Sequence, residues 1–265
     1  MTTSTNTFQI PPEAAELYEA QFVPGIFAEW APRLAEFAEI GSGHHVLDVG
    51  CGTGIVARTA ADLVGPQGSV VGCDLNQAML DVARRVRPDL TWRRGDAAAL
   101  PFDDASFDIV VCQMAMMFFP DRAAAVAEMA RVARQRVAVL VPSSLDDQPA
   151  YAIFTEVVSR HAGPEGAALV GAYWSCGDLD ELTGRLRSAG LDQVQAQTIM
   201  GTACFESVDA LVATEVEGSP LIELIDETTY AAIREDCRRE LDGFTTPSGA
   251  VEAPLSCHLV RGDIV

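Results

Sequence analysis

Three glycines and two aspartates are the residues most suited to chemistry in this sequence. Gly50, Gly52 and Gly54 stand at alternate positions after a short apolar run, in the stretch VLDVGCGTG. Glycine lets a backbone turn tightly and approach a ligand closely. Asp74 and Asp96 each follow a later apolar run. One carboxylate can accept hydrogen bonds from the two hydroxyls of a ribose and the other from the amino group of adenine. These residues together predict a site for a nucleoside.

The spacing of the glycines separates this turn from other nucleotide sites. A dinucleotide site carries GxGxxG, with the pyrophosphate at a helix N-terminus, and a P-loop carries GK[ST]. Here the spacing is GxGxG, and the turn has no Lys or Arg to meet a pyrophosphate. This favours a nucleoside that carries an amino acid over NAD or ATP. Asp48, just before the turn, either fastens the loop through backbone N–H groups or contacts the amino group of the ligand.

The elements that must position these residues alternate between strand and helix. Apolar runs predict strands over 45–49, 68–74, 90–96, 107–113 and 136–142, and periodic segments predict helices over 53–65, 76–87 and 122–134. Asn76 is the expected cap of the second helix. Alternation with short loops predicts a parallel sheet with helices on both faces, which binds ligands at the carboxyl ends of its strands.

The ends of the chain complete a single domain, as the length of 265 residues suits. Residues 1–42 are expected to form a tail and helices. Residues 43–205 and 254–265 are expected to form the core sheet with its helices, including strands over 192–205 and 255–264. Helices are also expected over 150–162 and 177–189. Residues 206–253 are an insertion between the last two strands, with a helical stretch over 207–241.

The sequence resembles the class I S-adenosylmethionine-dependent methyltransferases from Val46 to Val194. The resemblance rests on VLDVGCGTG, VVGCDLNQAMLDVA, GDAAALPFDDASFDIVVCQMAMMFFPD and LTGRLRSAGLDQV. The piece CQMAMMFFPD is most similar to the branch that includes the ubiquinone and menaquinone biosynthesis methyltransferases and many small-molecule methyltransferases. Many relatives carry a Pro-Gly-Gly turn before the fifth strand, where this chain reads RVARQRVAVLV, and we expect no effect on cofactor binding.

The resemblance implies a Rossmann-like α/β fold: a seven-stranded, mostly parallel sheet with an antiparallel last strand, helices on both faces and an N-terminal helical cap. It also implies S-adenosylmethionine as the cofactor. The implied contacts are Gly50 and Gly52 with its methionine part, Asp74 with its ribose, Leu75 and Met79 flanking the adenine, Asp96 and Ala97 at the adenine edge, and Gln113 beside the methionine part. Asp48 and Cys51 complete the expected cofactor set.

The implied reaction is methyl transfer to a small, largely apolar or aromatic metabolite. Met116, Met117 and Phe118 follow the fourth strand, and Phe22 and Trp30 belong to the first helical region; these five are the expected substrate-binding residues, although core packing would also explain some of them. Met adapts to irregular apolar shapes. Tyr18 could also close over the cofactor, and Tyr151, Phe154 and Trp174 could border the substrate, although packing explains each of these too. The acceptor, and whether O, N, C or S is methylated, stay open.

Composition excludes several classes of function. A formal net charge of −20 disfavours nucleic acid and anionic membranes as partners. The sequence has no apolar run that could span a bilayer, and we expect no signal peptide from its first residues, which are neither basic nor apolar. Seven cysteines without CxxC spacing indicate a reducing compartment, so we expect a cytoplasmic protein. Four histidines without metal-binding spacing predict no metal site. Cys51, Cys73 and Cys112 could bind a soft ligand such as arsenic, but small buried side chains explain them better.

No residue stands out as a general base. His161 falls near a helix end and His258 inside an apolar strand, and both are expected to be structural. Two rival functions stay open beside the methyltransferase: a protein that binds S-adenosylmethionine without transferring its methyl group, and an NAD-dependent oxidoreductase. The sequence does not indicate the oligomeric state.

Overall fold

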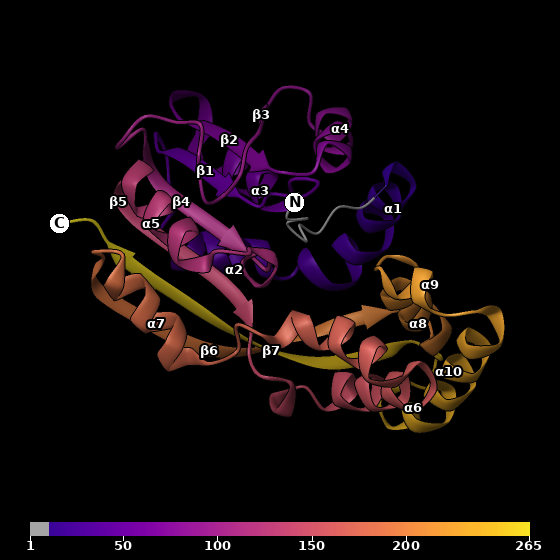
Figure 1. Cartoon of the computed structure of the whole chain (residues 1–265). Helices are drawn as coiled ribbons and strands as arrows, with labels where there is room; N and C mark the ends of the chain where they lie inside the picture. Colours follow the sequence, from indigo (N-terminus) through magenta and orange to yellow (C-terminus); the bar gives the residue numbers. More distant parts are fainter. Residues whose placement is uncertain (1–10) are drawn as a thin grey trace, which may run out of the picture.

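The computed structural model describes residues 11–265, and its centre is a seven-stranded sheet (Figure 1). The strands are β1 His45–Val49, β2 Ser69–Asp74, β3 Thr91–Arg94, β4 Phe107–Gln113, β5 Ala133–Pro142, β6 Asp192–Phe205 and β7 Val251–Asp263. Their order in the sheet is β3-β2-β1-β4-β5-β7-β6. Only β7 runs antiparallel to its neighbours, which are β5 and β6. The predicted fold class is therefore confirmed, including the antiparallel last strand.

Helices cover both faces of this sheet. The α-helices are α1 Pro12–Leu17, α2 Trp30–Phe37, α3 Ile55–Val64, α4 Gln77–Val86, α5 Arg122–Val132, α6 Pro149–Gly171, α7 Leu179–Ser188, α8 Val208–Glu217, α9 Leu221–Leu224 and α10 Glu227–Glu240. A π-helix spans Tyr18–Phe27, and short 3-10 helices span Gly65–Gln67, Met116–Phe118, Leu145–Asp147, Ala172–Trp174 and Asp242–Phe244. Helices α2 and α3 pack together, as do α5 and α7. The predicted cap of α4 is confirmed, since the Asn76 side chain accepts from the backbone N–H of Ala78.

The strand order changes direction next to β1. This strand pairs in parallel with β2 on one side and with β4 on the other. The connections that follow β1 and β4 therefore leave the sheet in opposite directions, which opens a crevice at the carboxyl ends of these strands. The glycine turn follows β1, Asp74 closes β2, and Gln113 closes β4. The fold thus brings the sequence-predicted residues to one edge of the sheet.

The N-terminal region forms helices, as expected, but one of them is not a regular α-helix. Residues Tyr18–Phe27 form a π-helix with Pro24 inside it, and α2 starts only at Trp30. Proline has no backbone N–H to donate and disrupts a regular α-helix, and π-helical turns often mark functional sites. The rings of Tyr18, Phe22 and Phe27 stack on one another, with centroids 5.1–6.1 Å apart. The wide turns thereby gather three aromatic rings into one cluster.

The last two strands are long and extend beyond the rest of the sheet toward α6, α8 and α10 (Figure 1). Strand β7 begins at residue 251, a few residues before its expected start, and pairs along its whole length with β6. The predicted helix over 150–162 agrees with the first part of α6, which breaks at Gly163, where φ is 69°; a second helical part continues to Gly171. The predicted helical stretch 207–241 is resolved into three helices. The division into a core and an insertion at 206–253 stays a prediction.

Candidate active site

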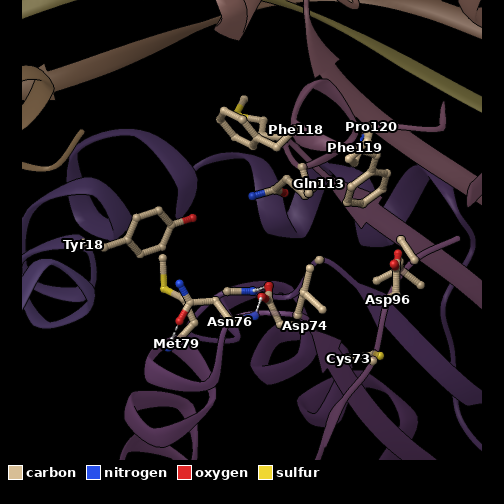
Figure 2. Close-up of a pocket in the computed structure, with 18 residues that line it drawn as sticks. Tyr18, Cys73, Asp74, Asn76, Met79, Asp96, Gln113, Phe118, Phe119 and Pro120 are labelled. Atoms are coloured by element: carbon tan, nitrogen blue, oxygen red, sulfur yellow. Dashed lines mark hydrogen bonds between the residues drawn. The ribbon is translucent and has the colours of Figure 1, made fainter. Parts of the chain in front are cut away.

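A cavity of about 860 Å³, partly open to solvent, lies at the carboxyl ends of β1, β2 and β4 (Figure 2). Its walls come from the glycine turn, the starts of α4 and the β3–β4 loop, the segment after β4, and the π-helix. The lining residues are Tyr18, Val49, Gly50, Gly52, Cys73, Asp74, Leu75, Asn76, Met79, Gly95, Asp96, Ala97, Gln113, Met114, Ala115, Phe118, Phe119 and Pro120. We call it the first cavity. In Figure 2 the side chains of Tyr18, Asp74, Asp96 and Gln113 surround one open space.

The glycine turn forms the floor of the first cavity and needs its glycines for two different reasons. Gly50, Gly52 and Gly54 all have positive φ, which strains other residues. A Cβ at Gly54 would also lie 2.2 Å from the Trp92 ring, so this glycine permits close packing. A Cβ at Gly52 would have the Tyr18 side chain as its nearest neighbour, at 3.5 Å, which is an ordinary contact distance. The turn thus packs tightly against Trp92 at Gly54, whereas at Gly52 it leaves space for a ligand in the cavity.

Asp74 ties the glycine turn to the start of α4. One carboxylate oxygen accepts from the Gly52 N–H and the other from the Asn76 N–H, each at 2.8 Å. Burial raises the pKa of the Asp74 carboxyl, and these two hydrogen bonds oppose the rise. A carboxylate oxygen has two lone-pair sites. Each oxygen of Asp74 can therefore accept a second hydrogen bond from a ligand in the cavity.

Two further polar side chains converge on the same space. Asp96 accepts from the Ala98 N–H at 2.9 Å through one oxygen, Oδ1. The amide of Gln113 donates from Nε2 to the Phe27 carbonyl at 3.1 Å, while its Oε1 is buried without a hydrogen-bond partner among the described residues. Buried polar atoms normally have partners, and an exception needs an explanation. A ligand with a hydrogen-bond donor would satisfy Oε1.

A second cavity adjoins the first. It has a volume of about 670 Å³, also partly open to solvent, and its walls are mostly apolar and aromatic. The lining residues are Tyr18, Phe22, Ile26, Phe27, Met114, Met117, Phe118, Pro142, Tyr151, Tyr173, Trp174, Glu215, Gly218 and Leu255. Tyr18, Met114 and Phe118 line both cavities. Cavities lined mostly by apolar and aromatic side chains, with a few polar groups, are typical of small-molecule sites.

Comparisons with known proteins agree with this arrangement. Residues 46–136 match the protein-family model described as a methyltransferase domain. The chain is 31% identical to nocamycin O-methyltransferase of Saccharothrix syringae, over 94% of this chain and 95% of that protein. The chain belongs to the S-adenosylmethionine-dependent methyltransferases. Its cofactor is therefore S-adenosylmethionine, and it is a methyltransferase of the small-molecule type, which leaves no support for the NAD-dependent oxidoreductase.

Two other similarities cover very different shares of the methyltransferase. It is 35% identical to the ubiquinone/menaquinone biosynthesis C-methyltransferase UbiE of Saccharophagus degradans, over 41% of this chain and 46% of that protein. The solved structure of phosphoethanolamine N-methyltransferase 2 of Haemonchus contortus, in complex with phosphomonomethylethanolamine and S-adenosylhomocysteine, has a TM-score of 0.59 and 17% identity. That match covers 96% of this chain and 57% of the other, and at this identity it shows a shared fold. No helix within residues 11–265 is long and apolar enough to cross a membrane.

Most of the cofactor-binding residues expected from the sequence line the first cavity of the methyltransferase; Asp48 and Cys51 do not. Asp48 lies behind the glycine turn and accepts from the Ala57 N–H of α3 at 3.0 Å. Burial raises the pKa of its carboxyl to about 7, against the effect of the Ala57 bond, and the nearby Asp74 adds to the rise. Its position supports the role of fastening the loop. The Cys51 side chain is buried near Gly72 of β2.

The expected substrate-binding residues divide into two groups. Phe22, Met117 and Phe118 line the second cavity. Trp30 and Met116 do not, and here the sequence-based placement needs correction. Trp30 is fully buried because its ring packs over Gly201 of β6, where no side chain intervenes. Met116 points the other way from the 3-10 helix after β4, toward Leu182 and Arg185 of α7.

The remaining aromatic, histidine and cysteine candidates also have definite places. Tyr151 and Trp174 line the second cavity, with ring centroids 5.0 Å apart, whereas Phe154 lies in the core. His258 hydrogen-bonds to Thr198 and to the Gly177 carbonyl, and His161 to Asp236. Neither histidine lines either cavity, which fits their structural interpretation. All seven cysteines are free, and burial raises the pKa of the Cys73 thiol to about 12, so this thiol stays protonated at neutral pH.

Glu215 is the functional candidate that the sequence reasoning missed. It lies on α8, is only 3% exposed and supplies the one carboxyl group among the residues lining the second cavity. A signal for it existed in the sequence. Val208, Leu211, Val212 and Val216 share one helical face, and Glu215 falls on that same face. A lone acid on an apolar face is rare and is usually paired or functional.

Proposed function

We propose that the methyltransferase holds S-adenosylmethionine in the first cavity and a small, largely apolar or aromatic acceptor in the second. The observation that carries this proposal is that Tyr18, Met114 and Phe118 are walls of both cavities. Cavities that share three lining residues are adjacent. A methyl donor and an acceptor that meet where the two cavities adjoin can be held in the geometry for direct transfer, which lowers the barrier substantially. S-adenosylmethionine supplies the methyl group when it is bound.

The residues of the first cavity match the parts of the cofactor. Asp74 would accept from the ribose hydroxyls, Asp96 from the adenine amino group, and Gln113 from the α-ammonium group of the methionine part. Leu75, Met79 and Ala97 offer apolar contact to the adenine. The glycine turn would bring the backbone close to the methionine part.

The lining of the second cavity supports the acceptor class. Among residues 11–265, no Lys, Arg or His lines this cavity, whereas aromatic rings from the π-helix, α6 and the segment before α7 do. An apolar molecule would bind there mainly by burial of apolar surface, worth ~25 cal/mol per Å². The similarity to nocamycin O-methyltransferase makes an acceptor oxygen the first to test. The net charge of −20 and the free cysteines support a cytoplasmic protein without a nucleic-acid substrate.

Transfer of a labelled methyl group tests the proposal. The protein is incubated with S-adenosylmethionine labelled in its methyl group and a panel of phenolic, quinol and polyketide-like hydroxyl compounds, and organic extracts are counted for label. We expect label in at least one apolar product. Met117→Glu, which puts a charge into the second cavity, should reduce this transfer more than about tenfold while S-adenosylhomocysteine still binds. Met116→Glu is no suitable probe, because Met116 faces α7. Transfer only to nucleic acid or to strongly charged metabolites would contradict the proposal.

Asp96 offers a test of the adenine contact. In Asp96→Asn the single remaining oxygen can keep the bond from the Ala98 N–H, so the NH₂ group would face the adenine amino group. We expect the affinity for S-adenosylhomocysteine, measured by calorimetry, to fall about tenfold, since a hydrogen bond to a charged group contributes ~1.5–3 kcal/mol. The melting temperature without ligand should barely change. The exposed Asp103→Asn is the matched control, and a large loss of unliganded stability would instead make Asp96 a structural residue.

Gln113 offers a test of the methionine contact. Gln113→Met keeps the length of the side chain and removes the buried Oε1 acceptor. We expect the affinity for S-adenosylhomocysteine to fall about tenfold. The affinity for methylthioadenosine, which lacks the amino-acid part, should stay the same. Equal losses for both ligands would show that Gln113 acts through its bond to the Phe27 carbonyl and not through the ligand.

A further inference from the structure

The second cavity contains one ionisable acid in an otherwise apolar and aromatic lining. Glu215 projects from α8 and is 3% exposed, and no Lys, Arg or His among the described residues lines the cavity with it. A buried charge is costly unless it is paired or hydrogen-bonded. Burial raises the pKa of the Glu215 carboxyl to about 7, and the nearby Tyr151 hydroxyl opposes only part of this rise. The carboxyl therefore lacks the cationic partner that a structural buried acid normally has.

A second buried polar group, the Tyr151 hydroxyl, lines the same cavity. The Tyr151 hydroxyl is buried without a well-formed hydrogen bond to any described residue, although it lies close enough to the Glu215 carboxyl for the two to interact. Glu215 is near enough to raise the pKa of this hydroxyl, together with the larger effect of burial. Buried polar groups in native proteins are seldom left without partners. Among the described residues, the Glu215 carboxyl and the Tyr151 hydroxyl thus have at most each other as partners. A carboxylate has lone pairs for further donors, so a donor on the ligand can complete this pair on the wall of the cavity.

We propose that Glu215, together with the Tyr151 hydroxyl, binds a hydrogen-bond donor on the methyl acceptor, either a hydroxyl or a protonated amine. The acceptor is then an apolar or aromatic molecule that carries such a donor, and Glu215 selects for it. This inference rests on the proposed function of the second cavity. A site built to hydrogen-bond a polar group rejects analogues that lack it strongly, because its own buried groups are then left unpaired.

The position of Glu215 makes it a residue for acceptor binding, separate from the cofactor. It does not line the first cavity. It lies near Tyr173, whose pKa its charge helps to raise, and the Tyr173 ring stands edge-on to Phe118, with centroids 5.7 Å apart. Phe118 belongs to the wall between the two cavities. Changes at Glu215 should therefore alter the binding of acceptors and leave the binding of S-adenosylhomocysteine intact.

Three probes that share a naphthalene ring test this proposal: 2-naphthol, 2-naphthylmethylamine and 2-methoxynaphthalene, which has no hydrogen-bond donor. Their binding to the full chain saturated with S-adenosylhomocysteine is measured by calorimetry. We expect 2-naphthol or the amine to bind about tenfold or more tightly than 2-methoxynaphthalene. Glu215→Leu should abolish this preference, and Tyr151→Phe should reduce it. Glu215→Gln should keep a preference for the hydroxyl and lose one for the amine, which distinguishes the two donors.

The outcomes distinguish the role of Glu215 from the proposed binding of the acceptor in the second cavity. Equal binding of all three probes to the wild type, or an unchanged preference in Glu215→Leu, overturns the role of Glu215 and leaves the aromatic acceptor cavity standing. Failure of all three probes to bind, while S-adenosylhomocysteine binds normally, overturns both. Each variant should bind S-adenosylhomocysteine as tightly as the wild type does, which shows that it is folded. If a Glu215 variant does not, the comparison between Tyr151→Phe and the wild type decides instead.

Discussion

Asp74→Ala is expected to lower the affinity for S-adenosylhomocysteine more than about tenfold. The substitution removes both oxygens that would accept from the ribose hydroxyls, and each such bond to a charged group contributes ~1.5–3 kcal/mol. It also releases the Gly52 and Asn76 N–H groups, which the same carboxylate now holds at 2.8 Å. The glycine turn and the start of α4 would then be less well ordered for the ligand. Both effects act in the same direction.

Calorimetry with the folded variant measures this loss. Asp103→Ala, at an exposed position on the loop before β4, is the matched control and should bind as the wild type does. Asp74→Asn gives an intermediate case, because one acceptor oxygen remains. Unchanged affinity in a folded Asp74→Ala protein would remove Asp74 from the cofactor site.

Glu215→Gln is expected to stabilise the methyltransferase increasingly as the pH rises from about 5 to 8. The pKa of Glu215 is about 7 in the folded protein, against 4.5 for an ordinary glutamate, because the carboxyl is buried. The folded state therefore keeps a proton that the unfolded state has lost, so wild-type stability falls as the pH rises through this window. A shift of this size corresponds to roughly 3 kcal/mol at pH values above 7. The Glu215→Gln protein carries a neutral amide at this position, so its stability does not fall with pH for this reason.

Urea unfolding at pH 5, 6, 7 and 8 measures the difference between the two proteins. Asp48 has a similarly raised pKa, but it is present in both proteins, so its contribution cancels in the difference. Glu223→Gln, at an exposed position, is the matched control and should give a difference that does not depend on pH. A difference for Glu215→Gln that is also flat across this range would mean that Glu215 ionises freely in the folded protein.

The sequence predicts the sheet and the polar residues of the first cavity well, for a physical reason. Gly50, Gly52, Asp74 and Asp96 stand at the ends of short apolar strands, and parallel strands must bring their carboxyl ends to one edge. Their place therefore depends on local patterns that can be read along the chain. Asp48 and Cys51 are nearby in sequence, but a strand points alternate side chains to opposite faces, and a turn can do the same.

The second cavity could not be predicted in the same way, because its walls come from elements far apart in the chain. Trp30 and Phe22 are both aromatic and close in sequence, yet the π-helix directs one to the cavity while α2 packs the other over Gly201. Met116 and Met117 are adjacent and face opposite sides of a 3-10 turn. Glu215 meets this cavity only because α8 packs beside the π-helix. Such contacts depend on tertiary packing and not on local periodicity.

A crystal structure with bound S-adenosylhomocysteine tests the central claim most directly. We expect the adenosine beside Asp74 and Asp96, the amino-acid part beside Gln113 and the glycine turn, and the sulfur facing the wall that Tyr18 and Phe118 share with the second cavity. A ligand bound outside the first cavity, or a sulfur directed away from that shared wall, would contradict the proposed path of the methyl group.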